Sequence, residues 1–175
     1  MISWQEKDIE DYVCENYPIL FDEDHEFLGR QVEIGVGIID VLLFDRCTGE
    51  LVVVEIKNKP ICNNALAQIM RYIPGVEDYY AEERDLFKYI NGVRGVLMGP
   101  SIIDETVSSL RMVQDRIKFH EILVSIDIDL DEKNYERNKE STNFRPTKFI
   151  GMLYSKLNEV GVIKPFDGDD PEAGD

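Results

Sequence analysis

Three charged residues lie within apolar stretches of the kind that form buried strands. Glu55 and Lys57 end the run Leu51–Lys57, and Asp40 lies inside Ile38–Phe44. Residues two apart in a strand leave the same face, so the Glu55 and Lys57 side chains are about 6 to 7 Å apart at ~3.3 Å per residue. A buried charge without a partner costs several kcal/mol, so each of the three needs a counter-ion, solvent or a metal ion.

Two interpretations of these charges are open. In the first, Asp40 and Lys57 form a structural ion pair at the end of a sheet, and Glu55 caps a neighbouring group. In the second, the two carboxylates and the backbone carbonyl of Ile56 supply the hard oxygen ligands that Mg²⁺ or Mn²⁺ prefers. A lysine beside such a site can orient the attacking water or stabilise charge at phosphorus. The pattern favours the second arrangement, which is suited to hydrolysing a phosphodiester bond.

The spacing of apolar residues predicts the elements that must position these groups. Helices are predicted over residues 4–16, 63–73, 103–115 and 144–160. Strands are predicted over residues 29–34, 37–44, 51–57, 93–98 and 117–128. The short turn Arg46–Glu50 predicts an antiparallel hairpin. The order helix, hairpin, helix, strand, helix, strand predicts an α/β fold, a mixed sheet with helices on both faces.

Local signals mark several helix ends. Ser3 and Glu6 have the types and spacing of a capping box for the first helix. Pro74 and Gly75 are expected to end the second helix, and Asp104 is expected to cap the third.

The composition excludes several classes of protein. The chain has 175 residues, a formal net charge of −16 and three cysteines. It has no run of ~18 to 20 uncharged apolar residues that could span a membrane, and its start lacks the pattern of a secretion signal, so the cytoplasm is the expected location. The cysteines fit neither a disulfide framework nor a structural zinc site. The charge argues against tight, non-specific binding to phosphate backbones.

The charge is unevenly distributed along the chain. Residues 133–164 carry seven basic and three acidic side chains, and residues 165–175 carry five acidic and no basic ones. The expected organisation is a core domain over 1–130, a basic helical extension packed on it over 131–164, and a disordered acidic tail over 165–175. The basic extension can be a DNA-contacting element or an ordinary solvated helix face, and the sequence leaves both open.

Five segments, taken in order, resemble a known family. They are Glu6–Glu10, Gly29–Val32, Gly37–Asp40, Leu51–Lys57 and Ala67–Tyr72. Gly37–Asp40 followed by Glu55–Lys57 resembles the bipartite signature of the PD-(D/E)XK nuclease superfamily. The whole run from Glu6 to Tyr72 resembles the nuclease domain of NucS/EndoMS-type endonucleases. This resemblance implies a restriction-endonuclease-like core and a metal-dependent DNA endonuclease that acts in repair, recombination or mobile-element defence.

The resemblance also implies a role for each matching residue. Asp40 and Glu55 would hold one or two Mg²⁺ ions, with Mn²⁺ as a substitute, and Glu10 would complete the metal shell or hold a second ion. Lys57 would orient the attacking water or stabilise the developing charge. Gln68 and Tyr72, four apart on one helix face, would line the catalytic cleft. For Glu10 the alternative is a solvated helix residue, and for Tyr72 it is core packing.

Three basic residues, Arg30, Lys59 and Arg71, are candidate phosphate contacts, and an ordinary surface charge is the alternative for each. The expected partners are DNA and a divalent metal ion, with a homodimer left open and with neither a membrane nor a nucleotide cofactor. The competing class of function is a catalytically inactive nuclease fold that binds nucleic acid or a protein partner, for instance as an acidic DNA mimic.

Overall fold

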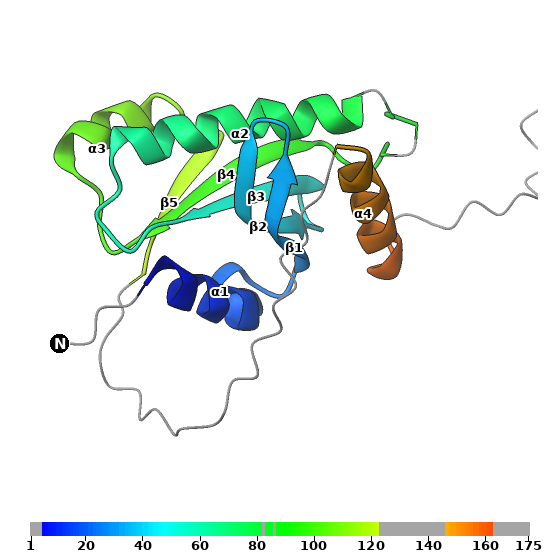
Figure 1. Ribbon diagram of the computed structural model, residues 1–175, viewed down its shortest axis with the longest axis horizontal. Helices are drawn as coiled ribbons and strands as arrows, with labels where there is room; N and C mark the ends of the chain where they lie inside the picture. Colours follow the sequence, from blue (N-terminus) through cyan, green and yellow to red (C-terminus); the bar gives the residue numbers. More distant parts are fainter. Residues whose placement is uncertain (1–4, 82, 86, 123–145, 163–175) are drawn as a thin grey trace, which may run out of the picture.

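The computed structural model describes residues 5–81, 83–85, 87–122 and 146–162. Its centre is a five-stranded sheet with the order β1-β2-β3-β4-β5. The strands are β1 (His25–Ile34), β2 (Gly37–Asp45), β3 (Glu50–Ile56), β4 (Gly92–Gly99) and β5 (Ile117–Glu121). The helices are α1 (Glu6–Phe21), α2 (Asn63–Ala81), α3 (Asp104–Arg111) and α4 (Pro146–Glu159). Figure 1 shows α1 on one side of the sheet and α2 and α3 on the other, which confirms the predicted mixed α/β fold.

The strand directions follow from the lengths of the connections. β1, β2 and β3 form an antiparallel meander joined by short turns, as predicted for the hairpin around Arg46–Glu50. β4 runs parallel to β3, and β5 runs parallel to β4. Parallel neighbours need a long crossover, and α2 and α3 provide the two crossovers.

The sheet separates two apolar cores. We call the side covered by α2 and α4 the α2 face, and the side covered by α1 the α1 face (Figure 1). Along β3, Val53 belongs to the core on the α2 face, whereas Val52 and Val54 belong to the core on the α1 face. This regular alternation would place the next side chain, Glu55, on the α2 face.

The last helix closes the α2 face near β1. Phe149, Leu153 and Leu157 of α4 are fully buried, and the Phe149 ring centroid is 5.0 Å from that of Tyr79 on α2. The helix predicted over 144–160 is therefore present as α4. The predicted domain boundaries stay predictions, because residues 123–145 and the expected acidic tail lie outside the described residues.

The predicted end of α2 is wrong. The helix continues through Pro74 to Ala81. Proline removes one backbone donor and costs about 3 kcal/mol inside a helix, yet Pro74 lies on the exposed side of α2 while Ile73 and Val76 beside it are buried in the core. Tertiary burial therefore outweighs the local break signal.

Other element ends also differ from the predictions. α1 has a kink at Asn16, near its predicted end, but continues to Phe21. Its capping bond runs from the Gln5 N–H to Asp8 Oδ2, 2.9 Å, and the predicted cap Ser3 lies outside the described residues. α3 begins at Asp104 as its first helical residue, not its cap, and ends at Arg111. β5 ends at Glu121. The strand is predicted to continue to residue 128, but residues 123–128 lie outside the described residues.

None of the helices in the described parts of the chain is long and apolar enough to cross a membrane.

Strands β2 and β3 separate partway along the sheet. Their pairing starts at Val41↔Val54 and extends toward the hairpin turn. On the other side of that pair, β2 stays paired with β1 as far as Ile34↔Gly37, while β3 stays paired with β4 as far as Ile56↔Met98. The tip of the β1–β2 hairpin thus leaves the sheet. We call the gap that opens beyond Val41 and Val54 the strand split.

The hairpin tip packs directly on α2. The Gly35 N–H donates a hydrogen bond to the Tyr79 hydroxyl, 2.6 Å. Gly37 has φ +154 and lies so close to Tyr72 that a Cβ there would be 2.5 Å from the ring carbon Cε1. A larger residue at position 37 would therefore push the tip away from α2 and alter the strand split.

Replacing Gly37 by alanine tests this packing. We expect Gly37→Ala to lower the free energy of unfolding by about 2 kcal/mol, because the ring of Tyr72 cannot move aside cheaply. Urea unfolding measures the change. Gly92→Ala is the matched control, since its Cβ would meet Glu50 Oε1 at an ordinary 3.7 Å, and it should change stability by less than about 1 kcal/mol. Equal effects of the two substitutions would contradict the close contact.

Candidate active site

The strand split brings two carboxylates together. Asp40 and Glu55 are the residues next to the last β2–β3 pair, Val41↔Val54, one on each strand. The Glu55 side chain is only 1% exposed. Burial and the nearby charge of Asp40 raise the pKa of Glu55 to about 7, and burial also raises the pKa of Asp40. The site therefore holds negative charge at an energetic cost.

Lys57 is the counter-ion of Glu55. Its Nζ donates to Glu55 Oε1 at 2.6 Å and lies 3.9 Å from Glu6 Oε2. Burial lowers the pKa of Lys57, but the hydrogen bond and charge of Glu55 outweigh it, so the pKa is raised and the ammonium stays charged. Lys57 is thus paired with Glu55, whereas one of the two interpretations of the sequence pairs it with Asp40. Among the described residues, the buried Glu55 Oε2 has no hydrogen-bond partner.

Asp40 joins the two separated strands. Its Oδ2 accepts the backbone N–H of Ile56 at 2.8 Å, beyond the point where β2 and β3 cease to pair. Its Oδ1 accepts Nε2 of Gln31 at 3.2 Å. Both carboxylate oxygens therefore have donors, which keeps the side chain in one position.

A third carboxylate comes from α1. Glu10 is 7% exposed, so it is not a solvated helix residue. Arg30 Nε donates to its Oε1 at 2.9 Å, and Gln31 Nε2 donates to its Oε2 at 2.8 Å. Burial raises the pKa of Glu10 although Arg30 opposes the shift. Because Gln31 also contacts Asp40, Glu10 is connected to the strand split through one amide group.

Gln68 and Tyr72 form a second pair on α2. Gln68 Nε2 donates to the Tyr72 hydroxyl at 2.8 Å, as their four-residue spacing allows. Tyr72 is 3% exposed and belongs to the core on the α2 face. Its ring therefore packs in the core, while its hydroxyl accepts the hydrogen bond from Gln68. The described hydrogen bonds of Asp40 lead to Gln31 and to the Ile56 backbone rather than to this pair.

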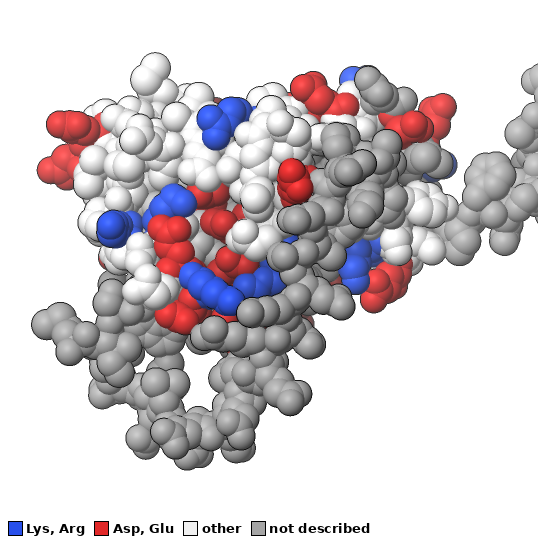
Figure 2. Space-filling view, viewed as in Figure 1, with Lys and Arg blue, Asp and Glu red and all other residues white. Residues whose placement is uncertain are grey.

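The three candidate phosphate contacts differ in their surroundings. Arg30 is 34% exposed and forms 2.8 Å ion pairs with both Glu10 and Asp11. Lys59 and Arg71 are exposed, and the Arg71 guanidinium lies 5.8 Å from the centre of the Tyr72 ring. Figure 2 shows acidic side chains gathered in the middle of one face, with basic side chains on several sides of them. Of the three, Arg30 has its charge already balanced by carboxylates.

Gln31 has no role predicted from the sequence. This residue has φ +48, in the left-handed region that non-glycine residues seldom adopt. A glutamine in a strand carries no signal of such a backbone, and its two carboxylate partners are 9 and 21 residues away. Only the tertiary structure reveals that it connects Glu10 and Asp40.

The donor set fits a divalent cation by its chemistry. Buried carboxylate oxygens are the ligands that Mg²⁺ and Mn²⁺ prefer, and Glu55 Oε2 is such an oxygen without a partner. In the present arrangement the Lys57 ammonium provides the positive charge beside Glu55. The described residues include no group of three or more His, Cys, Asp or Glu side chains arranged as in a metal site. Asp40 and Glu55 are therefore the two residues that would hold a cation, with Glu10 held nearby.

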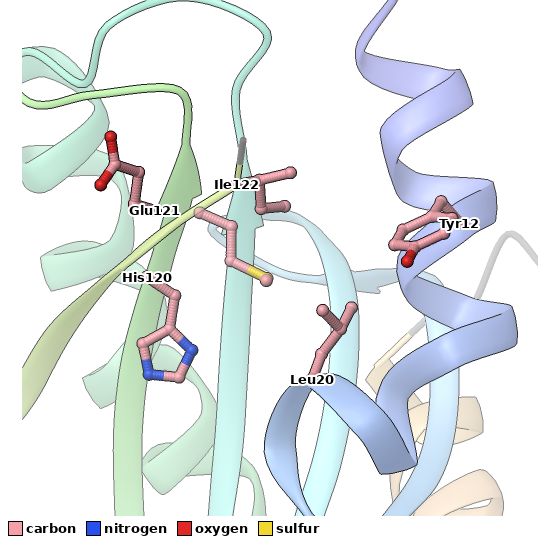
Figure 3. Close-up of a pocket in the computed structure, with 6 residues that line it drawn as sticks. Tyr12, Leu20, His120, Glu121 and Ile122 are labelled. Carbon is pink, nitrogen blue, oxygen red and sulfur yellow. The ribbon is translucent and has the colours of Figure 1, made fainter. Parts of the chain in front are cut away.

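A separate cavity of about 440 Å³ lies between α1 and the end of β5 (Figure 3). Its lining is Tyr12, Leu20, Met98, His120, Glu121 and Ile122. In Figure 3, Tyr12 and Leu20 come from α1 and lie across the cavity from the residues of β5. None of the predicted catalytic residues lines it, so the strand split remains the candidate active site.

Comparison with known proteins places this geometry in a family. Residues 5–144 match the family described as Endonuclease NucS C-terminal domain. Endonuclease NucS of Pyrococcus horikoshii is 27% identical over 103 residues, 59% of this chain and 36% of that protein. Endonuclease NucS of Methanopyrus kandleri is 30% identical over 99 residues, 57% of this chain and 34% of that protein. The chain thus spans about a third of the length of these relatives.

Solved structures share the fold. A repair endonuclease from Pyrococcus abyssi superimposes with a TM-score of 0.54 at 24% identity, covering 70% of this chain and 48% of that one. A complex of EndoMS with double-stranded DNA gives a TM-score of 0.54 at 25% identity, covering 69% of this chain and 46% of that one. The matched family covers most of the chain, from α1 through β5. The chain belongs to the family of the endonuclease NucS C-terminal domain.

Proposed function

We propose that this chain is a metal-dependent DNA endonuclease that hydrolyses phosphodiester bonds at the strand split. The observation that carries the proposal is the buried Glu55 carboxylate, which lies beside Asp40 and contacts Lys57. A carboxylate pair of this kind destabilises the fold, and such groups are kept where they do chemistry. The chain's membership of a family of endonucleases supports the same conclusion.

Asp40 and Glu55 would hold Mg²⁺ or Mn²⁺, with the Ile56 carbonyl as a further oxygen ligand and Glu10 completing the shell. When bound, the ion would polarise the scissile phosphate and lower the pKa of a coordinated water. Lys57 stays protonated beside Glu55, and an ammonium has no free electron pair. Its role is therefore to donate hydrogen bonds to the attacking water or to the charged phosphate oxygens, rather than to act as a base.

Duplex DNA is the proposed substrate, and repair is the proposed setting. A similar structure is described as a complex with double-stranded DNA and another as a repair endonuclease. The exposed side chains of Lys59 and Arg71 are the better candidates for phosphate contacts, because Arg30 is already paired with Glu10 and Asp11.

Cleavage assays on single variants test the proposal. We expect Glu55→Gln and Lys57→Met each to slow Mg²⁺-dependent cleavage by at least about 100-fold, because each removes a group that contacts the ion, the water or the phosphate. Glu105→Gln and Lys88→Met make the same chemical changes at exposed positions and should cleave like the wild type. The substrates are duplex, mismatched, branched and single-stranded DNA. If wild type cleaves none of them, or if the Glu55 and Lys57 variants cleave normally, the chain is a non-catalytic module.

The pH dependence of stability provides a test that does not need activity. The folded-state pKa of Glu55 is about 7 against an ordinary 4.5, so the folded protein retains this proton at a pH where the unfolded chain has lost it. The contribution of Glu55 to the free energy of unfolding is therefore full below about pH 4.5 and is lost as the pH rises through about 7.

Metal-free wild type should accordingly lose melting temperature between about pH 5.5 and about pH 8, relative to Glu55→Gln, which cannot ionise. Adding Mn²⁺ at the higher pH should restore the wild type and leave the variant unchanged. If the difference in melting temperature between wild type and Glu55→Gln is the same at both pH values, with or without Mn²⁺, then Glu55 is neither a strained carboxylate nor a metal ligand.

A further inference from the structure

One amide group connects the two carboxylates that come from different layers of the fold. Gln31 Nε2 donates to Glu10 Oε2 on α1 at 2.8 Å and to Asp40 Oδ1 on β2 at 3.2 Å. An amide nitrogen carries two hydrogens, so both are used. The remaining oxygens of these carboxylates have other donors, Arg30 for Glu10 and the Ile56 N–H for Asp40.

The backbone of Gln31 is held in an unfavourable conformation. Its φ of +48 lies in the left-handed region, which is sterically unfavourable for a residue with a Cβ. Such conformations persist when the surrounding contacts fix them, and they concentrate at functional sites. The two hydrogen bonds of the Gln31 amide are contacts of this kind, because they attach its side chain to α1 and β2.

The conformation changes the face to which β1 and β2 direct their side chains. Arg30 is opposite Val41, whose side chain is in the core on the α1 face, whereas Val32 is opposite Ile39, which is in the core on the α2 face. In a regular strand, residues 30 and 32 would share a face. The change occurs between these two pairs, and Gln31 is the residue of β1 that lies there.

This change of face lets two consecutive residues reach the same helix. In a regular strand, neighbouring side chains project to opposite sides, yet Arg30 and Gln31 both donate to Glu10. Arg30 binds Glu10 Oε1 and also Asp11. Gln31 binds the other oxygen, Oε2, and its neutral amide adds no positive charge between Glu10 and Asp40.

We propose that Gln31 is a positioning residue that holds the Glu10 carboxylate of α1 beside Asp40, so that Glu10 becomes part of the divalent-cation site at the strand split. The inference rests on the proposed function and identifies the contact that joins α1 to the site. Without the amide, Glu10 would keep its bond to Arg30 and lose its connection to Asp40.

Calorimetric titration of the metal-free chain with Mn²⁺ tests this role without measuring cleavage. Replacing groups that orient metal ligands typically weakens metal binding by about 10- to 100-fold. We expect a loss in this range for Gln31→Met and also for Gln31→Gly. The glycine variant removes the amide but tolerates the left-handed backbone, so it should melt at or above the temperature of the methionine variant. Gln114→Met makes the same change at an exposed position and should bind Mn²⁺ like the wild type.

A double-mutant cycle separates positioning from a general structural effect. Glu10→Gln should weaken Mn²⁺ binding in the wild type but have little further effect in the Gln31→Met background, because Glu10 is no longer beside Asp40 there. Additive losses would overturn the proposal, as would normal Mn²⁺ binding by both Gln31 variants, and either result would leave the proposed function standing. A wild type that binds no Mn²⁺ would overturn the proposed function and this inference together.

Discussion

The separation of β2 from β3 beyond Val41↔Val54 is the constraint on which the site depends. It removes backbone pairing at the level where Asp40 and Glu55 emerge on neighbouring strands. Burial of Glu55, and after it the nearby charge of Asp40, raise the pKa of Glu55 to about 7. The fold keeps the strands apart by attaching the hairpin tip to α2 through Tyr79. It limits the gap through the bond from the Ile56 N–H to Asp40. The same geometry that weakens the sheet therefore creates the site.

Electrostatics indicates how an acidic chain could act on DNA, as proposed. The net charge of −16 repels phosphate at long range, and the buried carboxylates at the strand split would repel it at short range. A bound divalent cation reverses the local sign, and Lys57 adds a positive charge that stays protonated. In the present arrangement Lys57 Nζ contacts Glu55 directly at 2.6 Å, so the ammonium partly compensates the carboxylates. Recognition of DNA and binding of the cation are thus expected to depend on each other.

The sequence was sufficient for the sheet and the hairpin, because apolar runs and short turns are local signals. Charges inside apolar strands also singled out Asp40 and Glu55, which lie next to Val41↔Val54 on neighbouring strands, and their role in a site stays a prediction. It was insufficient where distant contacts decide. α2 continues through Pro74 because tertiary burial outweighs a local break signal. The left-handed backbone of Gln31 depends on partners on α1 and β2. Arg30 contacts carboxylates on α1. Local sequence patterns do not predict this contact, because Arg30 and Glu10 are 20 residues apart along the chain.

The central claim is that the two carboxylates at the strand split hold a divalent cation. A crystal structure of the chain soaked in Mn²⁺, with anomalous diffraction data, tests it most directly. We expect one anomalous peak about 2.0 to 2.2 Å from an oxygen of Asp40 and an oxygen of Glu55, distances typical of small divalent ions, with Lys57 Nζ displaced from its contact with Glu55. Saturating Mn²⁺ that leaves no peak between these carboxylates, with Lys57 still bonded to Glu55, would contradict it.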